Sequence, residues 1–442
     1  MAGERTTYRL GDVCTKIGSG ATPRGGSSVY LDHGDVAFIR SQNVHNHGFH
    51  HDGLVYLTEQ HANELVNVEV VQGDVLLNIT GDSVARACQV HPDVLPARVN
   101  QHVAIIRPDP KRLSPRYLRY YLVSPIVQST MLLLAGAGGT RNALTKGMIE
   151  TLDVLAPAEV VEQQAIACIL GALDDKIELN RQMNETLEGM AWTLFRSWFA
   201  DFDPVRDKAT GHPLGLALAI ANLFPDAFDD SELGLIPVCW KVFPLPEIVE
   251  INPHRQLSKG TISKYLDMAS MPTKGHAPDS WIKREFGSGM KFINGDTLLA
   301  RITPCLENGK TAYVDFLEDG EVAWGSTEYI VLRPKEAIPT IFAYLLARSN
   351  NFRSFAIQRM TGSSGRQRVP PDSLSHYKIA APTLNSPIFD AFGRAVNPLF
   401  ERARLAIQQS RTLSSLRDAL LPKLVCGELP IPNAERIVGR CT

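Results

Sequence analysis

The longest regular pattern of apolar positions in the chain lies between residues 162 and 199. Seam residues, most of them apolar, recur there at alternating steps of four and three, and the segment holds no proline. This spacing is typical of a heptad repeat, so it predicts one long coiled-coil helix over 161–200. The seam positions are Ile166, Leu170, Leu173, Ile177, Asn180, Asn184, Leu187, Ala191, Leu194 and Trp198.

A second segment carries the same pattern about 225 residues further along the chain. It predicts a distal helix over 385–429, in which Asn397-Pro398 indicates either a restart or a kink. Arg417 is a misfit in this seam, beside the apolar Leu416. The seam positions are Phe392, Val396, Leu399, Ala403, Ala406, Ser410, Leu413, Arg417 and Leu420.

The charges of the two helices favour their pairing, because the first is acidic on balance and the second is basic. We expect an antiparallel coiled coil within the chain, with Asn180 and Asn184 fixing its register. The alternative is that each helix packs only on its own domain. A helix of about thirty residues extends roughly 50 Å, more than a cap on one small domain requires, which favours the coiled coil.

The duplication also covers the segments that precede the two helices. Gly73–Thr80 resembles Gly295–Thr303, and Val103–Pro108 resembles Tyr329–Pro334. A Gly-Asp turn followed by alternating apolar residues is typical of a half-buried strand, and helical patterns and a glycine-rich turn follow in both copies. Each copy is therefore predicted to be a mixed α/β domain of about 150 residues.

The predicted fold class is thus α/β (mixed α+β), with two tandem domains, two long antiparallel helices and a pseudo-twofold internal repeat. The predicted boundaries are 1–160 for the first domain, 161–200 for the central helix, 201–235 for a linker, 236–384 for the second domain, 385–429 for the distal helix and 430–442 for a tail.

Composition narrows the class of protein. Hydrophobic residues make up 44% of the chain, and no run approaches 18 apolar residues. We therefore expect a soluble cytoplasmic protein without a membrane segment or signal peptide. The net charge of −2 argues against a protein that coats nucleic acid nonspecifically, but it permits a local basic cleft. Seven scattered cysteines without a CxxC pair imply neither a disulfide framework nor a zinc ribbon.

Several motifs resemble the specificity subunit of a type I restriction-modification system, and together they span nearly the whole chain. They are the helix end Leu194–Phe199 with Asp201–Val205, the segment Ser231–Pro237, the terminal Leu416–Leu424 with Gly427–Leu429, and the turn Gly20–Pro23. Two departures are Cys239, where a glycine is usual, and the second copy's missing Gly-x-Thr-Pro turn, which affects the loops near residues 252–259.

The resemblance implies that each copy is a target-recognition domain and that the helices are spacers and docking surfaces. It implies binding to double-stranded DNA with a split recognition site, and assembly with two adenine methyltransferase subunits and with restriction subunits that translocate and cleave. The chain itself would be non-catalytic. S-adenosylmethionine, ATP and Mg²⁺ would be bound by the partner subunits.

Motifs for chemistry in the chain itself are missing. It has no GxxxxGK[ST] loop, no complete GxGxxG and no methyltransferase tetrapeptide, and Glu307 and Lys310 are wrongly spaced for a nuclease. The histidines His45, His47, His50 and His51 are too loosely spaced to predict a metal site. A stand-alone nuclease or methyltransferase is therefore a weak alternative. A tandem-domain coiled-coil scaffold that binds proteins rather than DNA is the stronger one.

Polar residues on loops are the candidates for DNA recognition, because base edges are read by such side chains on rigid frames. The glycine-rich turns supply Thr140, Arg141, Asn142 and Lys146 in the first copy and Ser363, Ser364, Arg366, Gln367 and Arg368 in the second. Loops next to the shared strands supply Arg40, Gln42, Asn43, Asn78, Thr80 and Arg86, and in the second copy Arg301, Thr303, Asn308 and Lys310. Thr22 and Arg24 of the turn near the start complete the set.

Overall fold

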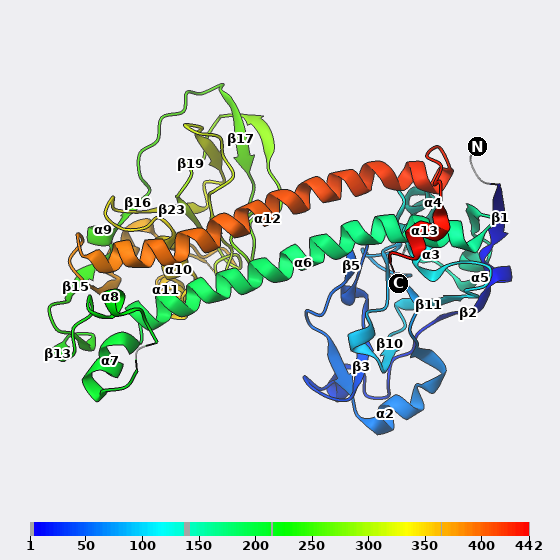
Figure 1. Ribbon diagram of the computed structural model, residues 1–442, viewed down its shortest axis with the longest axis horizontal. Coiled ribbons are helices and arrows are strands. Elements are labelled where there is room, and N and C mark those ends of the chain that lie inside the picture. Colours follow the sequence, from blue (N-terminus) through cyan, green and yellow to red (C-terminus); the bar gives the residue numbers. More distant parts are fainter. Residues whose placement is uncertain (1–3, 137–141, 214, 364, 442) are drawn as a thin grey trace. The chain divides into compact units, whose positions relative to one another are not determined.

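The computed structural model describes residues 4–136, 142–213, 215–363 and 365–441, and its chain divides into two compact units (Figure 1). Unit 1 comprises Met1–Ile177 and Arg411–Thr442, and unit 2 comprises Glu178–Ser410. The boundary falls inside both long helices, α6 (Val160–Phe199) and α12 (Pro387–Cys426). Each unit therefore joins one α/β domain to one part of each long helix.

Unit 1 contains two four-stranded sheets and two two-stranded sheets. The first sheet has the order β6-β3-β10-β7, in which β10 runs parallel to β3, and the second is antiparallel with the order β2-β11-β8-β9. The strands of the first are β3 (Val36–Ile39), β6 (Val55–Leu57), β7 (Glu69–Val70) and β10 (Ala97–Val99); those of the second are β2 (Cys14–Ser19), β8 (Val75–Asn78), β9 (Ala87–Gln89) and β11 (Val103–Pro108); β1 (Arg5–Arg9) pairs with β12 (Asp153–Pro157), and β4 (Val44–His45) with β5 (Gly48–Phe49).

Unit 2 repeats the topology of both four-stranded sheets and of the β1-β12 pair, whereas the β4-β5 pair has no counterpart in unit 2. Its sheets have the orders β18-β17-β22-β19, with β17 parallel to β22, and β16-β23-β20-β21. The strands are β17 (Ile262–Leu266), β18 (Ile282–Glu285), β19 (Met290–Phe292), β22 (Ala323–Gly325), β16 (Val249–Ile251), β20 (Thr297–Ala300), β21 (Thr311–Tyr313) and β23 (Tyr329–Pro334), with β15 (Lys241–Pro244) paired to β24 (Lys378–Ala381) and β13 (Phe228–Ser231) to β14 (Gly234–Pro237). The internal repeat predicted from the sequence is confirmed.

Some short helices occupy matching places in the two units, namely the helix after β1 or β15 and the two helices after β11 or β23. In unit 1 they are α1 (Leu10–Val13), α2 (Glu59–Glu64), α3 (Pro115–Val123), α4 (Pro125–Gly136), α5 (Lys146–Glu150) and α13 (Ala434–Val438). In unit 2 they are α7 (Asp203–Thr210), α8 (Leu218–Ala221), α9 (Leu245–Ile248), α10 (Ile341–Arg348) and α11 (Asn350–Gln358). Helices α3 and α10 each follow the central strand, β11 or β23, of an antiparallel sheet.

A buried ion pair is repeated beneath the Gly-Asp turns. Asp74 and Asp296 are fully buried and accept hydrogen bonds from Arg107 at 2.7 Å and Arg333 at 3.1 Å. Each carboxylate also accepts a backbone N–H three residues before it. The sequence repeat at these turns thus preserves a buried charge together with its partners, since an unpaired charge there would be costly.

The long helices complete the core of each unit. In unit 1, Ile166 and Leu170 of α6 lie in one cluster with Leu421 and Leu424 of α12. In unit 2 the helices contribute an aromatic cluster with α10, whose members are Phe195, Trp198, Phe199, Phe342, Phe389 and Phe392. The helix end Leu194–Phe199 that carries part of the family resemblance is therefore core.

Pairing of α6 with α12 is antiparallel in unit 2. Asn180 contacts Ala406 and Ser410 of α12. Phe199, further along α6, contacts Phe389 and Phe392 near the start of α12. Asn180 is fully buried and donates to the carbonyl of Ala406 at 3.3 Å, Gln409 at 2.9 Å and Ser410 at 3.1 Å. The predicted coiled coil is present, and the alternative of helices that pack only on their own domains is wrong.

Two features of α12 depart from expectation. The helix runs without interruption through Pro398, so of the two predicted alternatives, a restart or a kink, the restart is wrong. The misfit Arg417 lies in the seam, 8% exposed, and donates to Asp174 of α6 at 2.8 Å, whereas Leu416 is 46% exposed. An opposite charge on the facing helix makes arginine a seam residue here.

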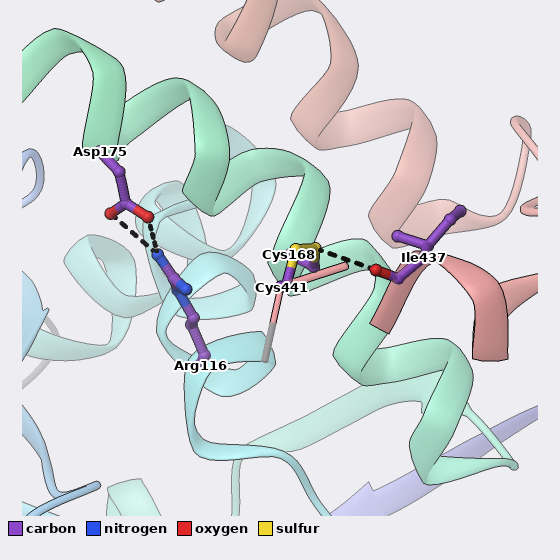
Figure 2. Close-up of a disulfide and its surroundings, with 5 residues drawn as sticks. All are labelled: Arg116, Cys168, Asp175, Ile437 and Cys441. Carbon is purple, nitrogen blue, oxygen red and sulfur yellow. Dashed lines mark hydrogen bonds and ion pairs between the residues drawn. A yellow bond between two sulfur atoms is a disulfide. The ribbon is translucent and has the colours of Figure 1, made fainter. Parts of the chain in front are cut away.

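The expectation that cysteine spacing implies no disulfide is wrong for one pair. Cys168 of α6 and Cys441 form a disulfide, with Cα atoms 6.2 Å apart, in unit 1 (Figure 2). Their sequence separation is 273 residues, so no local motif announces the bond. The other cysteines, Cys14, Cys88, Cys239, Cys305 and Cys426, are free.

We predict that Asn180→Asp destabilises unit 2 by roughly 2–4 kcal/mol, because a buried carboxylate would face the Ala406 carbonyl and the Gln409 side-chain oxygen. Asn180→Leu is the matched control and should change stability by only about 1 kcal/mol. All five tryptophans, at positions 192, 198, 240, 281 and 324, lie in unit 2, so tryptophan fluorescence during urea unfolding reports on this unit. Equal effects of the two substitutions would contradict the assignment.

We also predict that Cys441→Ser lowers the stability of unit 1 by about 2–4 kcal/mol under oxidising conditions and has no effect in reductant, because the bridge constrains the unfolded chain. Amide hydrogen exchange in unit 1 measures this difference. Cys426→Ser, at an exposed free thiol, serves as the control. Seven reactive thiols in unfolded, unreduced protein would rule out the bridge.

Candidate nucleic-acid interface

In each unit the segment after the inner strand β8 or β20 meets the end of the glycine-rich turn. In unit 1, Leu144 N–H donates to the Ile79 carbonyl at 2.8 Å. In unit 2, Val369 N–H donates to the Arg301 carbonyl at 2.9 Å, and Thr303 N–H donates to the Gln367 carbonyl at 3.0 Å. Two polar segments that the sequence analysis proposed separately thus converge on one surface in each unit.

The unit 1 surface carries a chain of hydrogen bonds between side chains. Thr80 Oγ1 lies 2.6 Å from His102 Nδ1, and Gln101 Nε2 lies 3.4 Å from His102 Nε2. Thr22 donates to the Gln101 side-chain oxygen. The arrangement holds a hydroxyl, an amide and an imidazole in fixed relation. These groups offer both donors and acceptors to a base edge.

The unit 2 surface carries arginines around one carboxylate. Glu328 accepts from Arg368 Nε at 2.8 Å, and Arg301 Nε lies 3.8 Å from Glu328 Oε2. Glu328 raises the pKa of Arg368 through a side-chain hydrogen bond. The side chain of Arg366 is exposed on the same turn. A carboxylate that orients arginines leaves their remaining N–H groups available for phosphate or guanine.

Sequence analysis missed three members of these surfaces: Gln101, His102 and Glu328. They occupy matching places, just before the central strands β11 and β23. The signal that could have found them is the repeat itself, since aligning the two central strands places His102 opposite Glu328.

Two predicted readers are buried, so the prediction that they lie exposed on loops is wrong. Asn43 is fully buried, accepts from Arg40 N–H, and donates to the His50 carbonyl at 2.9 Å. Asn78 is fully buried and donates to the Ser41 carbonyl at 2.8 Å. Both side-chain amides donate to backbone carbonyls within the fold. The same donor group would be needed to read a base, so residue type alone does not distinguish the two roles.

Some of the other predicted residues form hydrogen bonds or ion pairs within the chain, and others are exposed. Arg40 Nη2 and Gln42 Nε2 donate to the Gly53 carbonyl, and Lys146 pairs with Glu150 at 3.5 Å. Lys310, predicted to contact DNA, donates to the Met268 carbonyl at 2.6 Å, so its ammonium holds loop backbone. Arg86 is half-buried, and Arg24, Asn142, Asn308 and Ser363 are exposed. Thr140, Arg141 and Ser364 lie outside the described residues.

The clustered histidines form ring stacks. His45 and His50 are stacked with ring centroids 3.9 Å apart, and His51 meets His91 edge to face at 5.3 Å. Over the described ranges, no group of three or more His, Cys, Asp or Glu side chains could hold a metal ion. Nor does the part of the chain that the structure describes contain a helix long and apolar enough to cross a membrane.

Two loops of equal length follow equivalent strands. Loop A (residues 40–54) lies between β3 and β6, and loop B (residues 267–281) lies between β17 and β18. Loop B contains His276, which is 1% exposed and lies 3.2 Å from Asp315 and 3.7 Å from Glu188 of α6. Burial opposes a charge on this ring, but Asp315 and Glu188 outweigh it and raise the pKa of His276 to about 9.

We predict that unit 2 loses stability between about pH 6.5 and pH 9. A folded-state pKa above the ordinary value of 6.5 means that protonated His276 contributes fully below pH 6.5 and ceases to contribute as pH rises through about 9. The loss should be roughly 3 kcal/mol. Tryptophan fluorescence in urea at each pH measures it, and His276→Gln should flatten the profile. The same slope in the variant would exclude His276 as the source.

Comparison with known proteins gives consistent results along the chain. The sequence model of the family described as "Type I restriction modification DNA specificity domain" matches residues 3–189 and 237–394. The specificity subunit of the type I restriction enzyme HindI from Haemophilus influenzae is 24% identical, with 96% of this chain and 99% of that protein aligned. The MjaIX specificity subunit from Methanocaldococcus jannaschii is 27% identical, over 94% and 91% respectively.

Among solved structures, the S subunit of a type I restriction-modification system from M. genitalium has a similar fold. Its TM-score is 0.56 at 14% identity, and the match covers 96% of both chains.

Proposed function

Because this chain belongs to the type I restriction modification DNA specificity family and is a DNA-recognition subunit, we propose that each unit reads one half of a split duplex site. In unit 1 the reading surface comprises Thr22, Thr80, Gln101, His102 and Asn142. In unit 2 it comprises Arg301, Thr303, Glu328, Arg366 and Arg368. The observation that carries this assignment is the convergence of the same two polar segments in both copies.

The side chains of the two surfaces differ although their frames match. Unit 1 offers mainly neutral donors and acceptors, while unit 2 offers arginines oriented by Glu328. Neutral amide and hydroxyl groups suit adenine or thymine edges, and arginine suits guanine. The proposal therefore expects two half-sites of different sequence.

We further propose that the chain positions two adenine methyltransferase subunits and the restriction subunits of such a complex, which bind S-adenosylmethionine, ATP and Mg²⁺. The long helices support a docking role. Leu179 and Met190 of α6 are 55% and 51% exposed, and Leu405 of α12 is 44% exposed. Large apolar side chains left in water along a helix are typical of a surface that a protein partner covers.

Selection from a library of random duplexes tests the proposed function directly. The full-length chain, expressed with its methyltransferase subunits, should enrich one split motif with a fixed gap. Enrichment of a single uninterrupted motif, or of none, would contradict it. Binding of the methyltransferase subunits without any DNA enrichment would indicate a protein scaffold instead.

We predict that Arg366→Ala weakens binding to the selected site by roughly 1–3 kcal/mol and relaxes preference at one half-site only. Titration of labelled duplexes measures both effects. Arg402→Ala is the matched control, since Arg402 is exposed on α12 of the same unit. If Arg366→Ala behaves like Arg402→Ala, Arg366 does not contact bases.

A further inference from the structure

Loops A and B have unrelated sequences on a repeated frame. Loop A is RSQNVHNHGFHHDGL and loop B is DMASMPTKGHAPDSW, although the strands on either side occupy the same places in their sheets. Both loops expose polar side chains, among them Gln42 and His47 in loop A and Thr273 and Ser280 in loop B. A frame that is kept while its loop diverges is expected where the loop carries specificity.

In unit 1, a buried charge network ties loop A to the helix α6. Arg119 of α3 is 6% exposed and donates to the Asn46 carbonyl of loop A at 2.9 Å. The same guanidinium donates to Asp174 of α6 at 2.7 Å, which also accepts from Tyr120 at 2.7 Å and from Arg417 at 2.8 Å. Asp174 thus positions Arg119, and Arg119 in turn positions the backbone of loop A at Asn46.

In unit 2, the equivalent helix α10 ties loop B to α6 by the same types of residue. Arg348 donates to the Thr273 carbonyl at 2.6 Å and to the Gly275 carbonyl. Its Nε donates to Tyr344 Oη at 3.0 Å, and Tyr344 donates to Glu188 of α6 at 2.5 Å. His276 of loop B lies against the same carboxylate.

The two networks share one plan. In each unit a carboxylate of α6 accepts from a tyrosine of α3 or α10, and an arginine of that helix donates to loop carbonyls. Asp174 and Glu188 are separated by two heptads and therefore occupy the same position of the heptad repeat in α6. In unit 1, Arg119 and Asp174 form a largely buried, hydrogen-bonded ion pair, which fixes geometry more strictly than a surface pair does. In unit 2, Tyr344 links Arg348 to Glu188 through two hydrogen bonds.

We infer that Arg119 with Asp174, and Arg348 with Glu188, are positioning residues that set the backbone of loops A and B for reading one half-site each. This inference rests on the proposed function. The arginines act through loop carbonyls and not by touching bases. Their loss should therefore loosen discrimination at one half-site without removing a base contact of their own.

The experiment compares Arg119→Met and Arg348→Met, which keep side-chain bulk and remove the donors, in the full-length chain with its methyltransferase subunits. Selection from random duplexes gives the base preference at each half-site. Each variant should lose roughly tenfold discrimination per misread base pair at one half-site and leave the other within about twofold. The two variants should affect opposite half-sites.

Arg116→Met is the matched control for unit 1. Arg116 also lies on α3 and pairs with a carboxylate of α6, Asp175 at 3.0 Å, but this exposed pair donates to no loop carbonyl that the structure describes (Figure 2). It should leave both half-sites unchanged. Hydrogen exchange adds a folding check, since Arg119→Met should accelerate exchange in loop A and not in loop B.

Three outcomes overturn the inference while the proposed function stands: unchanged preference at both half-sites, equal loss at both, or loss that Arg116→Met reproduces. If Arg119→Met accelerates exchange in loop A but leaves the base preference at both half-sites unchanged, the inference is also overturned, because Arg119 would then anchor a loop that does not read DNA. If the wild-type chain selects no split site, the proposed function fails instead, and this inference fails with it.

Discussion

Pairing of α6 with α12 is the constraint on which the rest of the structure depends. Neither α/β domain closes its core alone: Leu170 and Leu424 complete unit 1, and Phe199 and Phe392 complete unit 2. The hydrophobic effect that drives this packing is non-directional. The buried amide of Asn180 adds direction, because its hydrogen bonds to α12 are made in one register only.

The sequence predicted the fold well where burial repeats at short period. Heptad spacing identified both long helices, and the second copy of the Gly-Asp turn identified the duplicated domain, since both patterns reflect which side chains leave water. The sequence did not predict the role of residues whose partner lies far away along the chain. Arg417 does not fit the apolar seam by sequence, but in the structure it donates to Asp174. Cys168 has no partner close by in the sequence, but in the structure it forms a disulfide with Cys441.

The candidate surfaces were predictable in part for a related reason. Glycine-rich turns and the segments beside the central strands stand out as polar sequence, and the fold brings them together. Residue type alone does not separate a base reader from a backbone anchor, because both need an amide or a guanidinium. Asn43, Asn78 and Lys310 hold loop backbone, and Glu328 contributes to the surface although an acidic residue near DNA is unexpected.

The distribution of charge bears on how this chain could bind DNA. Its net charge is −2, and at the unit 2 surface Arg301 and Arg368 share Glu328, so the positive charge that remains for phosphates is small. Nonspecific DNA affinity comes mainly from phosphate neutralisation and counterion release. Under the proposed function, Arg301 and Arg368 contribute to site choice more through oriented hydrogen bonds than through phosphate neutralisation. Under the same proposal, the loops that the fold orients in each unit supply the choice of site.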